Sequence, residues 1–300
     1  MKIKNLFLVA MISFLVLPIL ADEQKGKNPV DVWFYFQTQS EWTKYSRSFS
    51  IDKSRGFAIG KITENISYLV ETEVSPSIQL IKAQVGYQFG EQMLIIGQQS
   101  NSFKFYNPPP DKRIVSGPYP LGELVPTYDD LGITWQGKAW NFEYRFSLIN
   151  GAGRNKKDDN KDKDTVLYAK FTPLKQFAIA ACWQGGWQGK EDKEYRSGYW
   201  FQGEIEPFSG LLIKPTWVRR SDLEKEGWFI LGLLQINSKD QLLIQYLKDV
   251  NKDDELTLGG IFHFNKAMRF LPNIFLRKKA DNVYDYGIYL MTQVNIDKDL

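Results

Sequence analysis

Residue sets that could perform catalysis are scarce in this sequence. It holds one histidine, His263, at the end of an alternating stretch where Thr257, Gly259 and Ile261 share its face. A lone histidine lacks the partners that general acid–base catalysis requires, which favours a structural role. The sequence also has no nucleophile elbow, P-loop or HExxH motif. We therefore expect that the protein is not an enzyme.

Metal-binding patterns are equally weak. The acidic stretch 155–164 has four aspartates, as a calcium loop would, but lysines interleave with them and the required Gly and Glu are missing. A second acidic stretch, 250–255, has the same defect. The single cysteine, Cys182, excludes an internal disulfide and a cysteine zinc site. We expect solvated loops, no metal and no cofactor.

The first residues read as a targeting signal. Lys2 and Lys4 precede an apolar stretch from Leu6 to Leu20, and a small residue, Ala21, ends it. We expect a signal peptide at 1–21, removed by cleavage, and a mature domain at 22–300. With 38 Lys and Arg against 35 Asp and Glu, loss of the two leader lysines leaves a net charge of about +1. Such a balance argues against nucleic acid as a partner.

The composition is that of a folded chain. Of 300 residues, 43% are hydrophobic and 15% aromatic, which excludes disorder as the main state. Beyond the leader, no apolar run approaches the 18 residues of a membrane-spanning helix. The sequence therefore excludes a helical membrane protein.

A period of two runs through the chain from residue 30 to the end. From Trp140 to Leu148, every even position is large and apolar and every odd one is polar or charged. This alternation is typical of a strand with two unlike faces. It predicts sixteen strands, with fourteen as the alternative, at 30–43, 55–62, 65–74, 78–89, 92–100, 129–137, 139–149, 165–173, 176–184, 196–206, 211–219, 227–237, 241–249, 255–264, 267–277 and 283–295.

Short and long connections alternate between these predicted strands. The longer set comprises 44–54, 75–77, 101–128, 150–164, 185–195, 220–226, 250–254 and 278–282. Tight turns at one end and loops at the other are the plan of outer-membrane barrels. In lipid an open sheet would leave unpaired backbone groups at several kcal/mol each, and closure removes them. We therefore predict an all-β, transmembrane, up-and-down antiparallel barrel. A soluble β-sandwich is the disfavoured alternative, because its connections would scramble the alternation.

The alternation also predicts which side chains face the lumen. If the apolar residues face lipid, the opposite face meets water and carries both signs of charge, so the wall is nearly neutral. The predicted pore-lining residues are Glu71, Lys82, Gln98, Asp130, Glu143, Arg145, Lys170, Glu204, Lys214 and Arg269. Rings of such side chains set ion selectivity in pores.

The longest connection, 101–128, is rich in proline and contains apolar residues, which an external loop would expose to water without benefit. We expect it to fold into the lumen and narrow the channel. Lys104, Lys112 and Arg113 would then stand at the constriction, with Glu123 as a counter-charge. The alternative is an external loop packed against its neighbours.

Residues 55–153 resemble the phosphate-selective porin O and P family. The resemblance is carried by the stretches 55–61, 65–71, 83–89, 96–98, 130–133 and 150–153, in that order and spacing. It implies a sixteen-stranded channel, often trimeric, in the outer membrane of a Gram-negative bacterium, which passes small anions. The chain departs from the family after Gly97-Gln98, where the expected lysine is absent.

Together these observations predict a passive outer-membrane porin, embedded in outer-membrane lipid, for small hydrophilic or anionic solutes. Any anion preference would come from the cations of the loop 101–128. The alternative is a non-conducting barrel that serves as an adhesin or structural anchor through its external loops.

Overall fold

The computed structural model describes residues 30–44, 46–75, 77–106, 121–158, 160–189, 194–251 and 253–297. The predicted signal peptide lies outside these ranges, as do Lys112 and Arg113. No helix of the described residues is long and apolar enough to cross a membrane.

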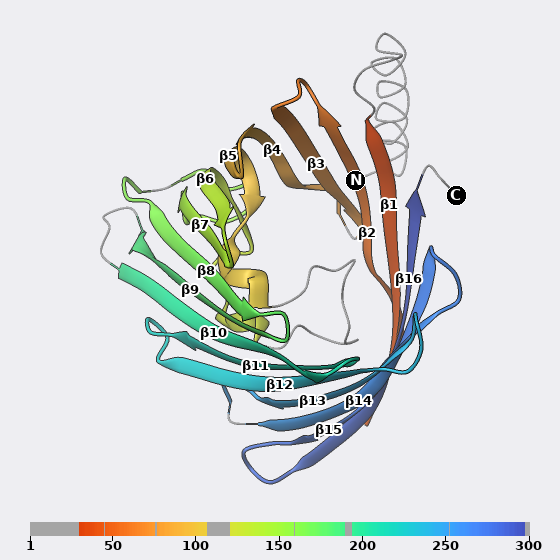
Figure 1. The fold of residues 1–300 in the computed structure, drawn as a ribbon. Coiled ribbons are helices and arrows are strands. Elements are labelled where there is room, and N and C mark those ends of the chain that lie inside the picture. The colour runs from red at the N-terminus through yellow and green to blue at the C-terminus, as the bar shows by residue number, and fades with distance from the viewer. Residues whose placement is uncertain are drawn as a thin grey trace.

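Sixteen strands make up nearly all of the described regular structure (Figure 1). They are β1 (Asp31–Thr43), β2 (Arg47–Lys61), β3 (Ile66–Ser75), β4 (Gln79–Phe89), β5 (Gln92–Ser100), β6 (Asp129–Ala139), β7 (Phe142–Ile149), β8 (Asp164–Leu174), β9 (Phe177–Gln188), β10 (Glu194–Phe208), β11 (Leu211–Arg220), β12 (Lys225–Gln235), β13 (Gln241–Lys248), β14 (Asp254–His263), β15 (Met268–Lys278) and β16 (Tyr284–Asp297). Two short 3-10 helices, η1 (Ser102–Tyr106) and η3 (Gly122–Leu124), lie in the connection between β5 and β6.

The sheet closes on itself. Each strand pairs antiparallel with its neighbours in the sequence, and β16 completes the ring by pairing with β1. The register between β1 and β16 runs from Trp33 opposite Asp297 to Thr43 opposite Gly287. This junction, the seam of the barrel, is therefore paired along its length. The predicted up-and-down barrel of sixteen strands is confirmed. Closure leaves no edge whose backbone groups would need a partner in lipid.

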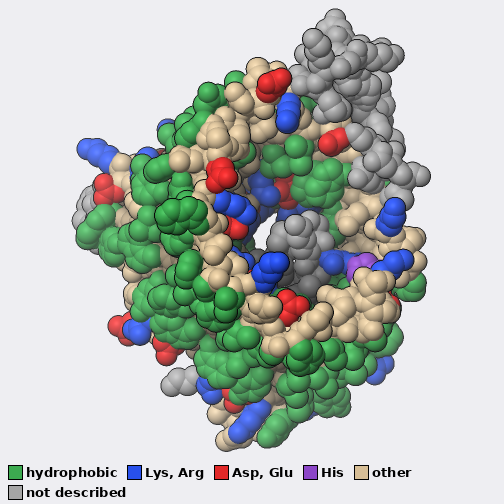
Figure 2. All heavy atoms as spheres, viewed as in Figure 1, with side chains coloured by type: hydrophobic (Ala, Val, Ile, Leu, Met, Phe, Trp, Pro, Cys, Tyr) green, Lys and Arg blue, Asp and Glu red, His purple; other side chains and the backbone are tan. Residues whose placement is uncertain are grey.

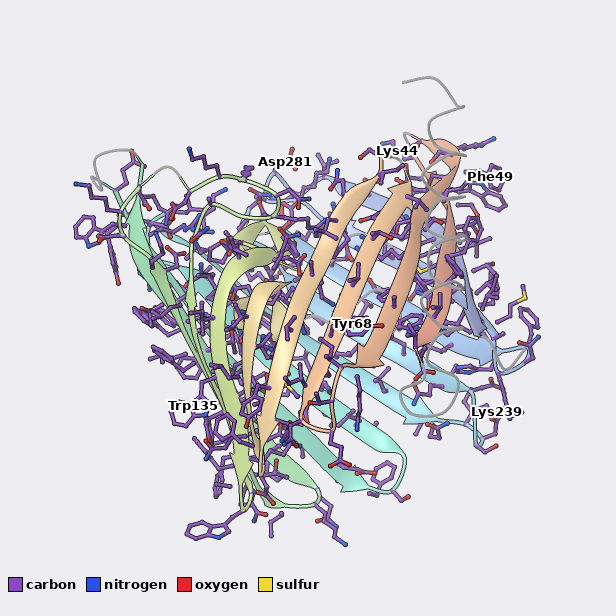
Figure 3. All side chains as sticks on the ribbon, turned by 90° about the horizontal axis from the view of Figure 1, so that it is seen from above. Lys44, Phe49, Tyr68, Trp135, Lys239 and Asp281 are labelled. Carbon is purple, nitrogen blue, oxygen red and sulfur yellow. The ribbon has the colours of Figure 1, made fainter. Side chains whose placement is uncertain are left out.

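The connections separate the barrel into two ends. At the turn end they span 62–65, 90–91, 140–141, 175–176, 209–210, 236–240 and 264–267. At the loop end they span 44–46, 76–78, 101–128, 150–163, 189–193, 221–224, 249–253 and 279–283. Figure 3 shows Lys44 and Asp281 at the loop end and Lys239 at the opposite one. The loop-end connections are longer than the turn-end ones mainly because of two loops, 101–128 and 150–163.

One predicted boundary is wrong. The first loop-end connection was expected at 44–54, but β2 begins at Arg47 and pairs with β1 from there. Phe49 and Ile51 are 80% and 51% exposed, and the serines beside them are exposed as well, so burial does not alternate along 47–51. A register shift opposite Gln37 and Thr38 then changes which positions face inward. Such a bulge interrupts the period of two, which hides the strand in the sequence.

The outer face of the barrel is apolar. Along β7, Phe142, Phe146 and Leu148 are exposed, while Arg145 and Ser147 between them point inward and are covered. Figure 2 shows hydrophobic side chains over the outer surface in view and charged ones around the central opening. Apolar atoms outside and polar atoms inside are the arrangement that a membrane barrel requires.

The inner wall is not polar throughout, contrary to expectation. One part of the inner wall, on β8 to β13, carries apolar side chains, and Val166, Cys182, Trp200, Val218 and Phe229 are buried there. They are covered by residues within and next to η1 and η3, since Phe103, Tyr106, Leu121, Leu124 and Val125 belong to the same buried cluster. An apolar wall is stable here because a protein segment, rather than water, contacts it.

Candidate functional site in the barrel interior

The described ends of the connection 101–128 pack on the inner wall. The Asn101 side chain donates to Gln184 Oε1 (2.7 Å) on β9 and to Thr127 Oγ1 (2.8 Å), and it accepts from the Phe103 amide. The Tyr106 hydroxyl donates to the Leu121 carbonyl (2.7 Å), which ties the two ends together. Burial raises the pKa of Tyr106 well above its ordinary value. These contacts hold η1 against β8 to β10 (Figure 1).

Lys104, one of the predicted constriction residues, reaches the wall. Its Nζ lies 2.6 Å from Asp129 Oδ1, and Arg154 holds the other oxygen of that carboxylate at 2.6 Å. Burial lowers the pKa of Lys104 below the ordinary lysine value, although Asp129 partly opposes the shift. Glu123 is exposed on η3. Lys112 and Arg113 lie outside the described residues, so their position at a constriction stays a prediction.

A network of charges, which we call the loop-end cluster, begins at this ion pair. It consists of the cations Arg55, Lys82, Lys104 and Arg154 and the carboxylates Glu71, Glu73 and Asp129. Glu71 is 1% exposed and lies 2.6 Å from both Arg55 and Lys82. The cluster joins β2, β3, β4 and β6 with the loop 150–163. The network has one more cation than carboxylates.

Glu71 and Lys82 were predicted to line the lumen, whereas Asp129 and Arg154 were missed. Asp129 stands next to the predicted Asp130 and was hidden by the alternation, which assigns it to the other face. Arg154 lies in a loop that folds back over β3 and β6, and no local sequence pattern predicts its contacts with Glu73 and Asp129. Arg55 was considered only as part of the family resemblance and was not predicted to line the lumen. In the register of the β2–β3 hairpin it lies opposite Glu73.

A second group, which we call the turn-end cluster, unites three predicted residues. Lys170 on β8 and Lys214 on β11 contact the two oxygens of Glu204 on β10, at 2.6 and 2.8 Å. The intervening strand β9 presents Ala178 and Ala180 inward, small side chains that leave room for the bridge. All three charged side chains are about one quarter exposed. Two cations therefore face the interior with one carboxylate between them.

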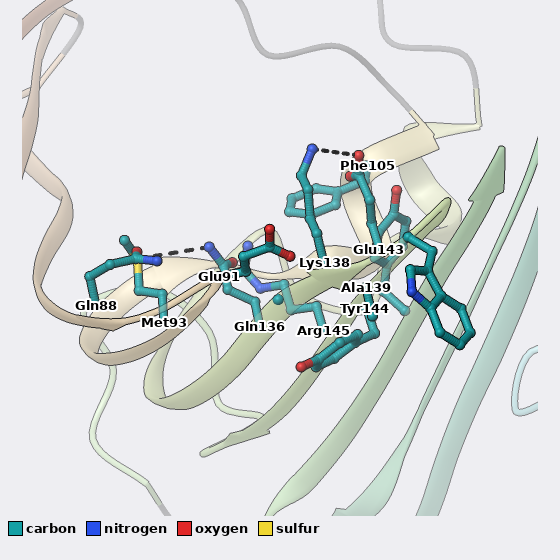
Figure 4. Close-up of a pocket in the computed structure, with 13 residues that line it drawn as sticks. Gln88, Glu91, Met93, Phe105, Gln136, Lys138, Ala139, Glu143, Tyr144 and Arg145 are labelled. Carbon is teal, nitrogen blue, oxygen red and sulfur yellow. Dashed lines mark hydrogen bonds and ion pairs between the residues drawn. The ribbon is translucent and has the colours of Figure 1, made fainter. Parts of the chain in front are cut away.

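Glu143 and Arg145 line a hollow of about 1110 Å³ between the wall and η1 (Figure 4). Glu143 pairs with Lys138 at 2.7 Å, and both are exposed. Arg145 Nη2 donates to Gln99 Oε1 (3.1 Å) and to the Ser100 carbonyl (3.2 Å). The ring of Phe105, from η1, lies 5.2 Å above its guanidinium carbon.

The other three predicted pore-lining residues bond mainly to the wall itself. Gln98 donates to the Leu80 carbonyl (2.7 Å) and accepts from the Asn155 amide, so it joins β4 to the loop 150–163. It lies opposite Leu131, which is 51% exposed on the outer face. Asp130 accepts from the backbone amides of Leu131 and Gly153. Arg269 donates to Gln293.

Solved structures with the same architecture include an anion-selective porin from Comamonas acidovorans. That structure has 9% sequence identity and a TM-score of 0.68, and the match covers 90% of this chain and 100% of the other. The barrel has the fold of the outer-membrane porins. OmpF of Salmonella typhi matches at 10% identity and a TM-score of 0.66, covering 90% of this chain and 98% of the other. OmpT, an outer membrane protein of Vibrio cholerae, matches in its trimer form at 12% identity and a TM-score of 0.67, covering 89% and 99%.

No protein-family profile matches the chain, and no curated protein sequence does. At identities this low, the similarity to known porins establishes the fold alone. The resemblance of 55–153 to the phosphate-selective porin O and P family stays a prediction.

The residues first considered for other chemistry have structural partners in this porin fold. The backbone amide of His263 donates to Asp240, whose Oδ1 lies 3.7 Å from the His263 ring nitrogen Nδ1. Cys182 is a buried free thiol within the apolar inner wall. Among the described residues, no three His, Cys, Asp or Glu side chains form a group that could hold a metal ion.

Proposed function

We propose that this protein is a passive channel in the outer membrane of a Gram-negative bacterium and admits small hydrophilic solutes. The observation that carries the proposal is the closed sixteen-stranded barrel, apolar outside and charged around an interior hollow. An apolar outer face is stable against acyl chains, and an interior with charged side chains holds water. The similarity in fold to known porins supports a transport role rather than catalysis.

The connection 101–128 would narrow this channel. Support comes from its described ends, which pack on the inward side of β8 to β12 instead of extending from the loop end. The residues between these ends include Lys112 and Arg113, which would bring two further cations to the narrowed region. Deleting the segment should therefore raise single-channel conductance, because conductance grows with the open cross-section.

A preference for anions would follow from the balance of interior charge. The loop-end cluster and the turn-end cluster each have one cation more than carboxylates. Cationic walls favour anions in water-filled pores. The fold similarity to a porin described as anion-selective agrees with this preference. Phosphate as the natural solute rests only on the family resemblance.

The assembly we propose is a homotrimer in outer-membrane lipid, reached by export with cleavage after Ala21. The trimer form of the Vibrio cholerae protein, whose fold is similar, supports this assembly. Cross-linking of the purified protein in detergent tests it, because a trimer gives a single product at three times the chain mass.

Reconstitution in planar bilayers tests the proposed function. We expect stepwise conductance in KCl and, in a KCl gradient, a reversal potential of the sign that anion preference requires. Absence of any conductance from folded, inserted protein would overturn the channel and favour the non-conducting adhesin or anchor. The connections 44–46, 76–78 and 221–224 are too short to offer an extended adhesive surface, which favours transport.

A further inference from the structure

The hollow beside η1 presents an arginine, Arg145, that contacts no carboxylate of the described residues. Arg145 bonds only through Nη2, to an amide and a backbone carbonyl. Its Nε is buried without a partner, and its Nη1 forms no hydrogen bond within the described residues. Arg55, Arg154 and Arg277, by comparison, each contact a carboxylate. Nη2 is already occupied and Nε is buried, so Nη1 is the donor that remains for a solute. A guanidinium N–H donor forms a strong, charge-assisted hydrogen bond with a carboxylate.

Aromatic side chains stand directly beside this guanidinium. Phe105 lies over Arg145 and is 37% exposed. The ring of Tyr168 packs edge-to-face against the ring of Phe105, with the ring centroids 5.5 Å apart. Met93, whose thioether adapts to ring surfaces, lines the same hollow (Figure 4). Small-molecule sites combine such apolar and aromatic walls with a few placed polar groups.

The charged groups on and beside the hollow leave Arg145 available to an anion. Lys138 and Glu143 neutralise each other at 2.7 Å, and Glu91 stands on the turn 90–91 at the rim. Lys170 lies opposite Glu143 in the register, and it belongs to the turn-end cluster with its excess cation. The lining of the hollow itself has two cations, Lys138 and Arg145, and two carboxylates, Glu91 and Glu143. Of the two cations, Arg145 is the one that contacts no carboxylate of the described residues.

We propose that this hollow is a binding site for small carboxylates that carry an aromatic ring. The carboxylate accepts a hydrogen bond from Nη1 of Arg145, and the ring packs against Phe105 and Tyr168. The volume of about 1110 Å³ exceeds what one such solute needs, so the site binds without sealing the lumen. The proposal deepens the proposed channel function and rests on it, since solutes reach the hollow through the lumen.

The test uses the full-length mature protein in planar bilayers, with benzoate as the probe. Acetate supplies the carboxylate without the ring, and benzyl alcohol supplies the ring without the charge. We expect benzoate to reduce single-channel KCl conductance in a saturable way, with a dissociation constant at least about tenfold lower than that of either control, a difference of about 1.4 kcal/mol.

Variants locate the site. Arg145→Gln should raise the benzoate dissociation constant about tenfold or more. Arg145→Lys keeps the charge but loses the planar guanidinium over which Phe105 lies, so it should raise the constant by a smaller factor. Phe105→Leu should raise it about threefold and leave acetate unchanged. Arg219→Gln is the matched control, because Arg219 is exposed and pairs with Glu226 at 3.7 Å, away from the hollow. Circular dichroism checks that each variant is folded.

The outcomes separate the two proposals. Stepwise conductance without benzoate block, or block that is unchanged in Arg145→Gln, would overturn the binding site and leave the channel intact. Equal block by acetate and benzoate would overturn the aromatic class. A folded, inserted protein that conducts nothing would overturn the channel itself. Block lost in Arg145→Gln and retained in Arg219→Gln supports the site.

Discussion

Replacement of Glu71 by glutamine tests whether the loop-end cluster stabilises the barrel. The Glu71 carboxylate is 1% exposed and lies 2.6 Å from Arg55 on one side and 2.6 Å from Lys82 on the other. The substitution keeps the shape of the side chain and removes its charge. Arg55 on β2 and Lys82 on β4, on either side of β3, then lose the carboxylate between them.

The loss in the free energy of unfolding depends on which partners Arg55 and Lys82 retain after the substitution. Breaking a buried ion pair by removing one partner costs about 3–5 kcal/mol. Arg55 retains Glu73 at 3.3 Å, and the Lys82 side chain is 23% exposed, so water can solvate it. We therefore expect Glu71→Gln to lower the free energy of unfolding by about 3 kcal/mol, near the lower limit of that range.

Glu143→Gln is the matched control on the same inner wall. Glu143 and its partner Lys138 are 42% and 67% exposed, and an exposed pair contributes about 0–1 kcal/mol. Denaturant unfolding in detergent micelles, followed by tryptophan fluorescence, measures both variants. Equal losses for the two substitutions would refute the reasoning, because burial would then have no bearing on the strength of the pairs. Glu71→Gln should also shift the reversal potential towards anions, since it adds one net positive charge to the lumen.

Further predictions concern the loop, the turns and pH. Charge reversal of both Lys112 and Arg113 to Glu should move the reversal potential in a KCl gradient towards cations; an unmoved potential argues against their place at the constriction. Asn101→Ala removes bonds to Gln184, Thr127 and the Phe103 amide and should cost about 2 kcal/mol of local stability, seen as faster hydrogen exchange across 102–106, whereas unchanged exchange would mean that the loop is held elsewhere. Gly97→Ala should destabilise the barrel by more than about 2 kcal/mol, because Gly97 has a φ of 125° and a Cβ would lie 2.2 Å from the Ala83 carbonyl oxygen, while Gly90→Ala, with open space around it, should cost about 1 kcal/mol in the same unfolding assay. Because burial lowers the pKa of Lys104 below the ordinary lysine value of 10.5, its charge is lost at a lower pH than that of an exposed lysine. The difference in reversal potential between the wild type and Lys104→Gln should therefore fall, below pH 10.5, to half of its size at neutral pH, and a midpoint at or above that pH would contradict the burial.

The barrel could be predicted because its outer face obeys a local rule. Phe142, Phe146 and Leu148 must alternate with inward residues wherever lipid covers one side of a strand, and this rule needs no information from elsewhere in the chain. It failed at Arg47 to Ser54, where a bulge changes the register and serines weaken the contrast between faces.

The interior was harder to predict because its contacts are non-local. Lys170, Glu204 and Lys214 could each be assigned to the inner face, but the contact between Lys170 and Glu204 also depends on the small residues of β9 between them. The contact of Arg154 with Glu73 and Asp129 depends on how a loop folds back, which alternation does not encode. The apolar inner wall around Trp200 could not be predicted from the strands alone, because it is stable only where η1 covers it.

The seam between β1 and β16 has a consequence for the order of assembly. The Gln293 side chain donates to that of Gln37, 256 positions earlier in the chain. Hairpins between sequence neighbours close short segments at little entropic cost, whereas this junction requires that all the intervening strands have found their places. We expect the junction to form last, so that the slow step in refolding joins the two outermost strands and depends on the pairing of every other strand.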